Sequence, residues 1–400
     1  MFSLLSVMLA ATAALISVPI AVFFVEVVAS LGSSEPDREE RPEGMPRGRI
    51  AVVVPAHNES SGVLPTIGDI KPQLSSVDRL IAVADNCTDD TAELALAAGA
   101  EVVVRNDPAR IGKGFALGRA ISHLSSDPPD LVVFVDADCR IESDMIARLA
   151  AVCARTRRPV QACFLMKSPE DSPIDHSFAE FAWIIRNWAR PLGLRNLGCP
   201  VQLMGTGMIF PWELIRVAPL ESGHLVEDLK LGLDLAAIGK APLFFPFVIG
   251  SSEFPMSVKG TNSQRQRWIQ GHVAMMFRTA PLLLVRAIAR GNIDLLVLTL
   301  DLVVPPLSLL GLLVVGTLGV SSVAALAGAS VAPALISFAN LMMFVLTLLF
   351  AWLKFGKDIL PARTIASKLP LIAQRLVLYG QMFLGRTANQ WIRTDRGRSD

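Results

Sequence analysis

The hydrophobic pattern divides the chain into an apolar N-terminal stretch, an alternating middle region and two apolar stretches near the C-terminus. In the middle region, short runs of β-branched residues alternate with segments of helical spacing, which predicts buried strands joined by helices. Such alternation is typical of an α/β fold with a mostly parallel sheet. The predicted strands are Ile50–Val54, Leu80–Ala84, Glu101–Val104 and Leu131–Val135, and the predicted helices are Thr88–Ala98, Lys113–Leu124 and Leu229–Ala237. The stretch Phe181–Leu194 is interpreted as a core helix.

The apolar stretches at both ends of the chain are long enough to cross the hydrocarbon core of a membrane. Residues 1–31 carry no charge before Glu26, and no evident cleavage site follows them, which predicts an uncleaved transmembrane anchor. Residues 293–353 are predicted to form two transmembrane helices, from about Leu295 to Ser321 and from about Val331 to Leu353. We therefore expect three spans.

Asp301 falls inside the first of the two C-terminal spans. An ionisable group within a span is costly and is a candidate functional residue. Asp301 also lies near the expected cytoplasmic start of that span, where water or an interfacial partner would satisfy its charge. The pattern leaves its role open.

The basic residues orient the spans. Four arginines lie between residues 38 and 49, whereas none precedes the first span, so the positive-inside rule places the middle region in the cytoplasm. After residue 353, nine Lys/Arg and three Asp give a local charge of +6, and this basic tail suits anionic headgroups better than nucleic acid. The expected units are an anchor (1–31), a linker (32–49), a cytoplasmic catalytic domain (50–272), an interfacial helix (273–292), two transmembrane helices (293–353) and a basic interfacial tail (354–400).

Composition agrees with this organisation. Hydrophobic residues make up 52% of the chain and the mean hydropathy is +0.47, above the usual apolar share of a soluble domain. The five cysteines show no metal-ligand spacing, and their odd number argues against a secreted disulfide framework. We expect them to be packing residues. The predicted location is a bacterial inner or plasma membrane, with the catalytic domain in the cytoplasm.

Polar residues follow three predicted strands, in Pro55-Ala-His-Asn-Glu59, Asp85-Asn86 and Asp136-Ala-Asp138. Ligands bind beyond the carboxyl ends of strands in such sheets, so these residues are expected to converge. The spacing of Asp136 and Asp138 lets both carboxylates face one point, where they suit Mg²⁺ or Mn²⁺ and a substrate diphosphate. A solvated turn would also explain such a pair.

Two motifs at predicted helix starts carry candidate chemistry. Gly112-Lys113-Gly114 offers close backbone approach and positive charge to a phosphate group. Glu227 and Asp228 could supply a general base. Acidic residues at a helix start more commonly complement the helix dipole, so this pair is ambiguous by itself.

Gln264, Arg267 and Trp268 form a third motif, before the predicted interfacial helix. Arg267 could bind a diphosphate in a bidentate way, and Trp268 could offer an apolar wall to a sugar or lipid. A membrane-interface segment would explain Arg267 and Trp268 equally well, but not Gln264.

Taken in order, these motifs resemble those of the membrane-bound family 2 glycosyltransferases, such as the cellulose, hyaluronan and poly-N-acetylglucosamine synthases and ceramide glucosyltransferase. The resemblance covers about residues 50–275 and implies a GT-A-type nucleotide-sugar-binding domain. It also implies an inverting transfer that uses Mg²⁺ or Mn²⁺. The matching pieces are Pro55-Ala-His-Asn-Glu59, Asp85-Asn-Cys-Thr-Asp-Asp-Thr91, Gly112-Lys-Gly114, Asp136-Ala-Asp138, Gly205-Thr-Gly207, Glu227-Asp228 and Gln264-x-x-Arg267-Trp268.

The resemblance implies a role for each motif residue. Asp228 would be the catalytic base that deprotonates the acceptor hydroxyl. Asp136 and Asp138 would hold the metal on the donor diphosphate. The implied donor-binding residues are Pro55, Glu59, Asp85, Lys113, Asp136, Asp138 and Arg267, and the implied acceptor-binding residues are Glu227, Gln264 and Trp268.

The expected partners are a nucleotide sugar (a UDP-sugar above all), a glycan or lipid acceptor, membrane lipids and a possible export partner, with no nucleic acid. The expected process is the synthesis of a cell-surface polysaccharide or glycolipid. Three spans are few for the polymer channel of a processive synthase, so chain synthesis and single-sugar transfer both stay open. A channel or transporter subunit with a nucleotide-sensing domain, and an inactive scaffold, are the alternatives from other classes.

Overall fold

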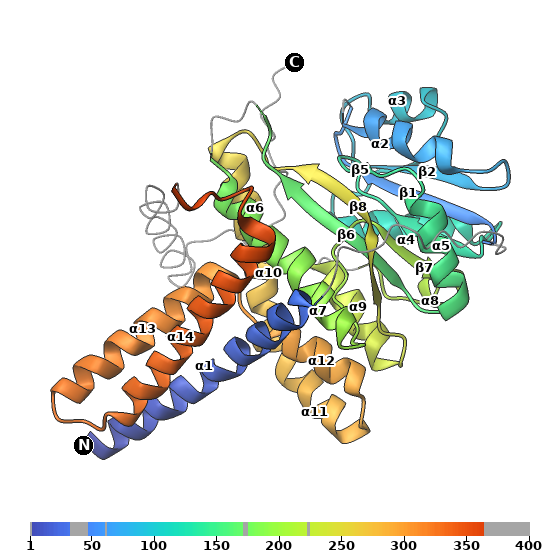
Figure 1. The fold of residues 1–400 in the computed structure, drawn as a ribbon. Coiled ribbons are helices and arrows are strands. Elements are labelled where there is room, and N and C mark those ends of the chain that lie inside the picture. Colours follow the sequence, from blue (N-terminus) through green and yellow to red (C-terminus); the bar gives the residue numbers. More distant parts are fainter. Residues whose placement is uncertain (1, 33–46, 61, 171–174, 222–224, 364–400) are drawn as a thin grey trace.

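The computed structural model of the protein describes residues 2–32, 47–60, 62–170, 175–221 and 225–363. Its centre is a sheet of eight strands: β1 (Ile50–Ala56), β2 (Arg79–Asp85), β3 (Glu101–Arg105), β4 (Leu131–Phe134), β5 (Arg140–Ile141), β6 (Val160–Lys167), β7 (Met208–Pro211) and β8 (Leu243–Glu253). The strand order is β3-β2-β1-β4-β7-β6-β8-β5 (Figure 1). The first four strands pair in parallel, as the alternating pattern predicts. The other half is mixed: β7 is antiparallel to β4 and β6, and β8 is parallel to β6 and antiparallel to β5.

Helices cover both faces of the sheet because alternate residues of a strand point to opposite sides. These helices are α2 (Val63–Ile70), η1 (Lys71–Gln73), α3 (Thr91–Ala97), α4 (Lys113–Leu124), α5 (Met145–Thr156), α8 (Trp212–Ile215) and α9 (Glu227–Ala237). Val52 and Val54 of β1 share one core layer with α2 and α5. Ala51 and Val53 share the opposite layer with α4 and α9. Packing of these two layers on the sheet holds in place the strand ends that carry the polar motifs.

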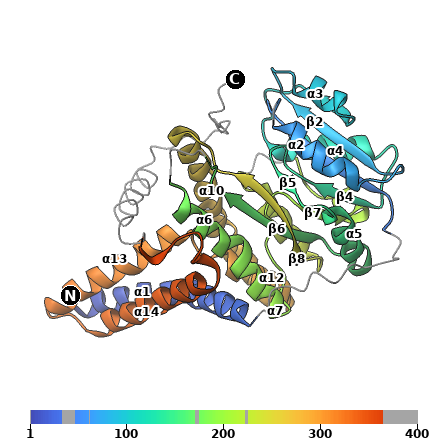
Figure 2. The same ribbon diagram turned by 45° about the horizontal axis from the view of Figure 1, so that its top comes forward.

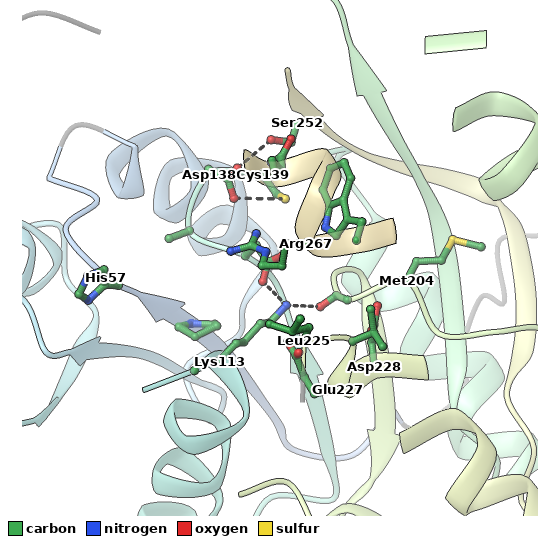
Figure 3. Close-up of a pocket in the computed structure, with 18 of the residues that line it drawn as sticks. His57, Lys113, Asp138, Cys139, Met204, Leu225, Glu227, Asp228, Ser252 and Arg267 are labelled. Carbon is green, nitrogen blue, oxygen red and sulfur yellow. Dashed lines mark hydrogen bonds and ion pairs between the residues drawn. The ribbon is translucent and has the colours of Figure 1, made fainter. Parts of the chain in front are cut away.

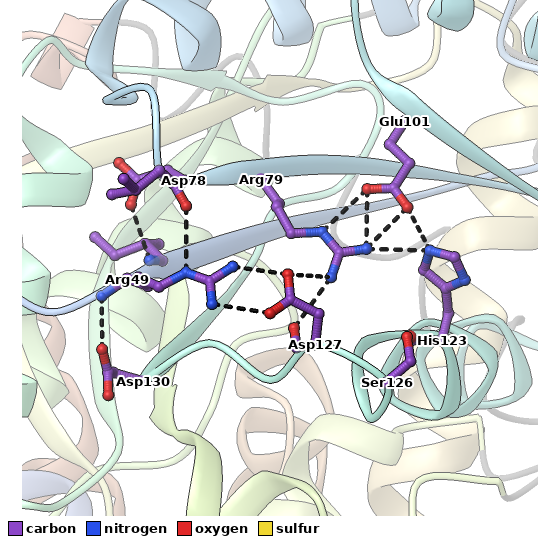
Figure 4. Close-up of polar contacts among 10 residues, drawn as sticks. Arg49, Asp78, Arg79, Glu101, His123, Ser126, Asp127 and Asp130 are labelled. Carbon is purple, nitrogen blue, oxygen red and sulfur yellow. Dashed lines mark hydrogen bonds and ion pairs between the residues drawn. The ribbon is translucent and has the colours of Figure 1, made fainter.

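The amino ends of the parallel strands are joined by surface ion pairs (Figure 4). Asp127, before β4, pairs with Arg49, before β1, at 2.8 Å. Arg79 of β2 pairs with Glu101 of β3 at 2.8 Å, and Glu101 also contacts His123 of α4. Hydrogen bonding by Arg79 lowers the pKa of the Glu101 carboxyl. Exposed pairs of this kind contribute little each, and they align the strand starts at the end of the sheet opposite to the polar motifs.

A second group of helices links the sheet to the apolar helices: α6 (Ser177–Ile184), the π-helical turn η2 (Ile185–Ala189), α7 (Arg190–Asn196), α10 (Val258–Arg278), α11 (Ala280–Arg290) and α12 (Ile293–Leu302). The axes of α10 and α11 differ by 48°. Pro281, in the first turn of α11, cannot continue the hydrogen bonding of α10. The helix expected at 273–292 is therefore the end of α10 plus α11, and its interfacial position stays a prediction.

Three helices are long and apolar enough to cross a membrane: α1 (Phe2–Leu31), α13 (Leu307–Leu326), and α14 (Ala332–Ala351) with the π-helical turn η3 (Trp352–Gly356). They pack together in a bundle that extends away from the sheet (Figures 1 and 2). The span expected from Leu295 to Ser321 is wrong in its first part, because Pro305–Pro306 separate α12 from α13. Asp301 consequently lies on α12, outside the candidate spans.

Arg190 of α7 joins helix α1 of the bundle to α12. Its guanidinium donates to Glu26 of α1 and to Asp301 of α12, each at 2.5 Å, and all three side chains are buried. Removing one member of such a buried cluster costs about 3–5 kcal/mol. Gly193, one turn further along α7, lets α1 approach closely, because a Cβ there would lie 1.7 Å from the Glu26 carbonyl oxygen.

Residues 33–46 and 364–400, which hold most of the expected linker and most of the expected basic tail, lie outside the described residues.

Replacing Gly193 with alanine is expected to destabilise the full chain in detergent. The added Cβ would overlap the backbone of α1, so the contact between α1 and α7 must open, at a cost of about 1–3 kcal/mol or more. Thermal unfolding followed by tryptophan fluorescence measures the loss. The matched control is Gly68→Ala, which adds the same group to α2 with nothing within 4 Å, and it should be neutral or slightly stabilising. Equal unfolding temperatures for the two variants would contradict the contact.

Candidate functional site

Two asparagines cross-link the loops after β1, β2 and β3. Asn58 and Asn86 have positive φ angles of 54° and 52°, a conformation that asparagine tolerates better than most residues. The Asn58 Oδ1 accepts a hydrogen bond from the Thr88 N–H at 2.7 Å, and the Asn86 Oδ1 accepts one from the Asp107 N–H at 2.7 Å. These bonds hold the three strand ends side by side.

Asp85, at the end of β2, is buried and paired. Arg105 of β3 donates to its Oδ1 at 2.6 Å. Burial raises the pKa of the Asp85 carboxyl, and Arg105 offsets part of that rise. A ring nitrogen of His57, after β1, lies 2.7 Å from the Asp85 carbonyl oxygen. The candidate base-reading acid therefore sits in a polar corner that the strand ends build.

Asp136 and Asp138 converge after β4. Their carboxylate oxygens and the Cys139 Sγ lie within 4.8 Å of one another. The Ser252 hydroxyl of β8 donates to the Asp138 Oδ2 at 2.8 Å, and the Asp136 N–H donates to the Thr206 Oγ1 at 3.0 Å. Burial raises the pKa of the Cys139 thiol well above its usual value, which keeps it neutral. The two carboxylates are the hard oxygen ligands that Mg²⁺ or Mn²⁺ prefers, so the residues fit such an ion.

Lys113, in the first turn of α4, faces these carboxylates (Figure 3). Its Nζ pairs with Asp136 and donates to the Gly205 carbonyl oxygen at 2.6 Å. Burial lowers the pKa of Lys113, but Asp136 and Glu227 outweigh burial, so the pKa is raised. Lys113 therefore keeps its positive charge beside the strand ends.

Glu227 and Asp228 begin α9 and reach the same space. Burial raises the pKa of both carboxyls, and the neighbouring Asp228 charge adds to the rise for Glu227, whose pKa is about 7. Lys113 opposes both shifts. A carboxylate with a raised pKa is a stronger proton acceptor, so this pair has the electrostatics of a general base.

Tryptophans from two helices form an aromatic wall. The rings of Trp183 on α6 and Trp268 on α10 have centroids 4.7 Å apart, and the Trp183 Nε1 donates to the Phe164 carbonyl oxygen at 3.1 Å. Gln264 precedes Trp268 by one turn of α10 and is buried, but its side chain bonds to no residue that the structure describes. The tryptophan rings thus offer a surface on which a ligand can stack, and the Gln264 amide can form hydrogen bonds to that ligand.

The sequence prediction missed Arg186. It lies on η2, with its guanidinium carbon 5.7 Å from the centroid of the Trp183 ring. The sequence of 181–194 predicts a core helix, because its mixture of aromatic and basic residues is compatible with one. Arg186 lies in a π-helical turn, and such turns are frequent at functional sites. The turn is not recognisable from the sequence, so it could not mark Arg186 in advance.

A cavity of about 680 Å³ lies at the carboxyl ends of β1, β2 and β4. The cavity is lined by every site residue predicted from the sequence: Pro55, Glu59, Asp85, Lys113, Asp136, Asp138, Glu227, Asp228, Gln264, Arg267 and Trp268. It is also lined by residues that the sequence analysis did not select as site residues, among them Cys139, Trp183, Arg186 and Ser252. The geometry assembles the predicted set, and the individual roles remain proposals.

The family model of glycosyltransferase like family 2 matches residues 46–271, more than half of the chain. The chain belongs to the family 2 glycosyltransferases. The enzyme class expected from the ordered motifs is thereby confirmed.

Curated relatives of this family 2 glycosyltransferase are named glucosyl-3-phosphoglycerate synthase. The one from Mycobacterium tuberculosis is 42% identical over 211 residues, which cover 47% of this chain and 63% of the relative. The one from Mycolicibacterium smegmatis is 34% identical over 194 residues, with 44% of this chain and 61% of the relative covered. The chain thus spans less than two thirds of the length of these relatives.

Among solved structures, the mannosyltransferase PcManGT from Pyrobaculum calidifontis, in complex with GDP-Man and Mn²⁺, matches with a TM-score of 0.53. The sequences are 18% identical, and the match covers 86% of this chain and 98% of that one. This likeness confirms the GT-A fold expected from the sequence.

Gly205→Ala is expected to reduce sugar transfer by about 10- to 100-fold, because small displacements of reacting groups are costly. Gly205 has a φ of 91°, and a Cβ there would lie 3.3 Å from the Asp228 Oδ2 and 3.6 Å from the Lys113 Nζ. Gly239→Ala is the matched control, since Gly239 has a φ of 76° with nothing within 4 Å. Initial rates should fall only for Gly205→Ala, while both variants lose some thermal stability. Equal rates in the two variants would show that Gly205 does not shape the cavity.

Proposed function

We propose that this chain is a membrane-anchored, inverting glycosyltransferase. It moves a hexose from a nucleoside diphosphate sugar to a membrane-associated glycan or lipid, in the synthesis of a cell-surface polysaccharide or glycolipid. The observation that carries the proposal is the single cavity that joins the candidate metal ligands Asp136 and Asp138 to the candidate base Asp228. The relatives named for glucosyl transfer support a hexosyl donor.

The donor occupies the strand-end side of the cavity. Asp85 contacts the nucleotide base, in a corner that Pro55 and Glu59 also line. Asp136 and Asp138 would hold Mn²⁺ or Mg²⁺, and such an ion would supply positive charge beside the diphosphate. Lys113, already charged and fixed by Asp136, adds a second positive charge at the same place.

Asp228 acts as the base of a single displacement. Its carboxylate takes the proton of the acceptor hydroxyl, while the acceptor oxygen bonds to the anomeric carbon. The bond between that carbon and the diphosphate oxygen breaks, which inverts the configuration. Glu227 and Gln264 orient the acceptor, Trp268 stacks on it, and Arg267 supports the leaving diphosphate. Burial suits Asp228 for this step because it raises the carboxyl pKa.

The acceptor reaches the cavity from the side of the apolar helices. Trp268 lies on α10, and the next helix, α11, exposes Leu282, Val285 and Ile288. Arg286 lies among these apolar residues, and an apolar face punctuated by arginine is typical of a helix in the headgroup region. This arrangement supports an acceptor held at a membrane surface.

Asp228→Asn is expected to reduce sugar transfer by about 10²- to 10⁴-fold, because the variant cannot accept the proton. Washed membranes carrying the full chain are assayed with labelled UDP-glucose, UDP-N-acetylglucosamine and GDP-mannose. Nucleotide binding should persist in the variant. Asp234→Asn is the matched control, since Asp234 lies on the same helix and pairs with Lys230.

Three outcomes of this assay would count against the proposal. Full transfer by Asp228→Asn would remove its role as the base. Nucleotide binding without any transfer by the native chain would favour the channel or transporter reading. Activity released by a carbonate wash would contradict the membrane anchor. The product separates the two acceptor classes, since a ladder indicates chain synthesis and one lipid-soluble product indicates single transfer.

Removal of divalent ions with EDTA is expected to abolish transfer, and Mn²⁺ or Mg²⁺ should restore it. Asp138→Asn should abolish most of that rescue, and Ser252→Ala should raise the Mn²⁺ concentration for half-maximal rate by about tenfold, because Ser252 orients Asp138. Asp127→Asn, at the opposite end of the sheet, is the control and should behave like the native chain. Full activity in EDTA would rule out the metal role of Asp136 and Asp138.

A further inference from the structure

Residues 204–206, in the segment between α7 and β7, form a short loop (the cavity loop) that contacts the donor-binding side of the cavity. The Gly205 carbonyl oxygen accepts a hydrogen bond from the Lys113 Nζ at 2.6 Å. The Thr206 Oγ1 accepts one from the Asp136 N–H at 3.0 Å. The position of this loop therefore affects both the ammonium group and a carboxylate that are proposed to act on the donor diphosphate.

The cavity loop also lies against the candidate base. Gly205 has a φ of 91°, and a Cβ there would lie 3.3 Å from the Asp228 Oδ2. Met204, Lys113 and Asp228 all line the cavity (Figure 3). Transfer requires the base, the acceptor oxygen and the anomeric carbon in one arrangement, so a shift of the loop would slow the reaction.

Gln161 of β6 holds the cavity loop from the interior of the protein. Its Oε1 accepts a hydrogen bond from the Met204 N–H at 2.7 Å, and its Nε2 donates to the Thr206 carbonyl oxygen at 2.9 Å and to the Ala162 carbonyl oxygen at 2.8 Å. Gln161 is fully buried and is not among the described residues that line the cavity. One amide group thus bonds to the main chain at both ends of the loop.

The surroundings of Gln161 on β6 are apolar. Val160, Ala162 and Cys163 are fully buried as well. A buried amide is costly unless its hydrogen bonds are made, so an apolar side chain would fill this place without that cost. A buried polar group whose bonds are all made instead specifies one arrangement of the groups that it contacts.

We propose that Gln161 is a positioning residue for sugar transfer. It fixes the cavity loop, and the loop sets the relative positions of Lys113, Asp136 and Asp228. The inference rests on the proposed function and adds a residue that acts on the reaction through the main chain, without contact to donor or acceptor.

The test compares Q161M with a matched variant, Q73M, in the full chain. Methionine keeps the length of the side chain and removes the amide donor and its carbonyl oxygen. Gln73 holds a turn in the same way, since it accepts from the Ile146 N–H at 3.1 Å and donates to the Glu142 carbonyl oxygen at 3.1 Å. None of these three residues is among the described residues that line the cavity.

Q161M is expected to reduce kcat by about 10- to 100-fold and to leave the donor KM within about threefold, because misplaced groups matter most in the transition state. Q73M should leave both values at the native level. Initial rates per amount of chain are measured in washed membranes, with Mn²⁺ and the nucleotide sugar that the native chain transfers.

Q161E gives a second readout that depends on pH. The protonated form of the introduced carboxyl can donate to the Thr206 carbonyl oxygen and accept from the Met204 N–H, whereas the ionised form cannot donate. Burial raises the pKa of a carboxyl. The rate of Q161E relative to the native chain should therefore rise as the pH falls through that pKa, although both rates fall as Asp228 is protonated. A residue that only stabilised the fold would leave this ratio constant.

Calorimetry of nucleotide binding with Mn²⁺ shows whether each variant is folded and keeps the donor site. Native transfer rates in a Q161M chain that binds nucleotide would overturn the inference and leave the proposed function standing. An equal loss of rate in Q73M, or a Q161E ratio that does not change with pH, would also overturn it. If Q161M does not bind nucleotide, the pH dependence of Q161E decides. A native chain that binds nucleotide without any transfer would instead count against the proposed function itself.

Discussion

The buried cluster of Glu26, Arg190 and Asp301 is the constraint on which the rest of this structure depends. A guanidinium removed from water is tolerated only when carboxylates satisfy it, so α1, α7 and α12 must meet at one point. The same run of helix carries η2 and Arg186 into the cavity wall. Helix α1 and the cavity wall are therefore joined by one contact, and a bundle that moved away from α7 would leave a buried charge unpaired.

The two ends of the sheet differ in how their acidic residues are paired. At the amino ends, Asp127 pairs with Arg49 and Glu101 pairs with Arg79, so these acids have arginine partners within the protein (Figure 4). At the carboxyl ends, Asp136, Asp138 and the acids of α9 crowd one cavity, where burial raises the Glu227 pKa to about 7. That crowding opposes folding, and the hydrogen-bonded strand ends hold it in place. Lys113 compensates only part of this acidic cluster, and carboxyls with raised pKa values in one cavity are typical of a functional site.

The apolar helices show what a hydropathy pattern can and cannot predict. A buried helix and a membrane span have the same apolar composition, so α12 and α13 merge into one predicted span. Pro305–Pro306 break that span, and α12 packs instead against α9. Pro281 divides α10 from α11 in the same way. The sequence shows both prolines. The place of each short helix after the break depends on the part of the fold against which the helix packs.

The amino-acid sequence by itself determined the parallel strands β1 to β4, the polar residues at their ends and the apolar helices. Each of these rests on a local period or on neighbours a few residues apart, which the chain carries wherever it folds. Only the tertiary structure decided the mixed half of the sheet, the place of Arg186 and the partner of Asp301. These depend on contacts between distant segments, such as the 164 residues that separate Glu26 from Arg190. Asp136 and Asp138 were foreseeable because they follow one strand, whereas their distance from Asp228 was set by how α9 packs on the sheet.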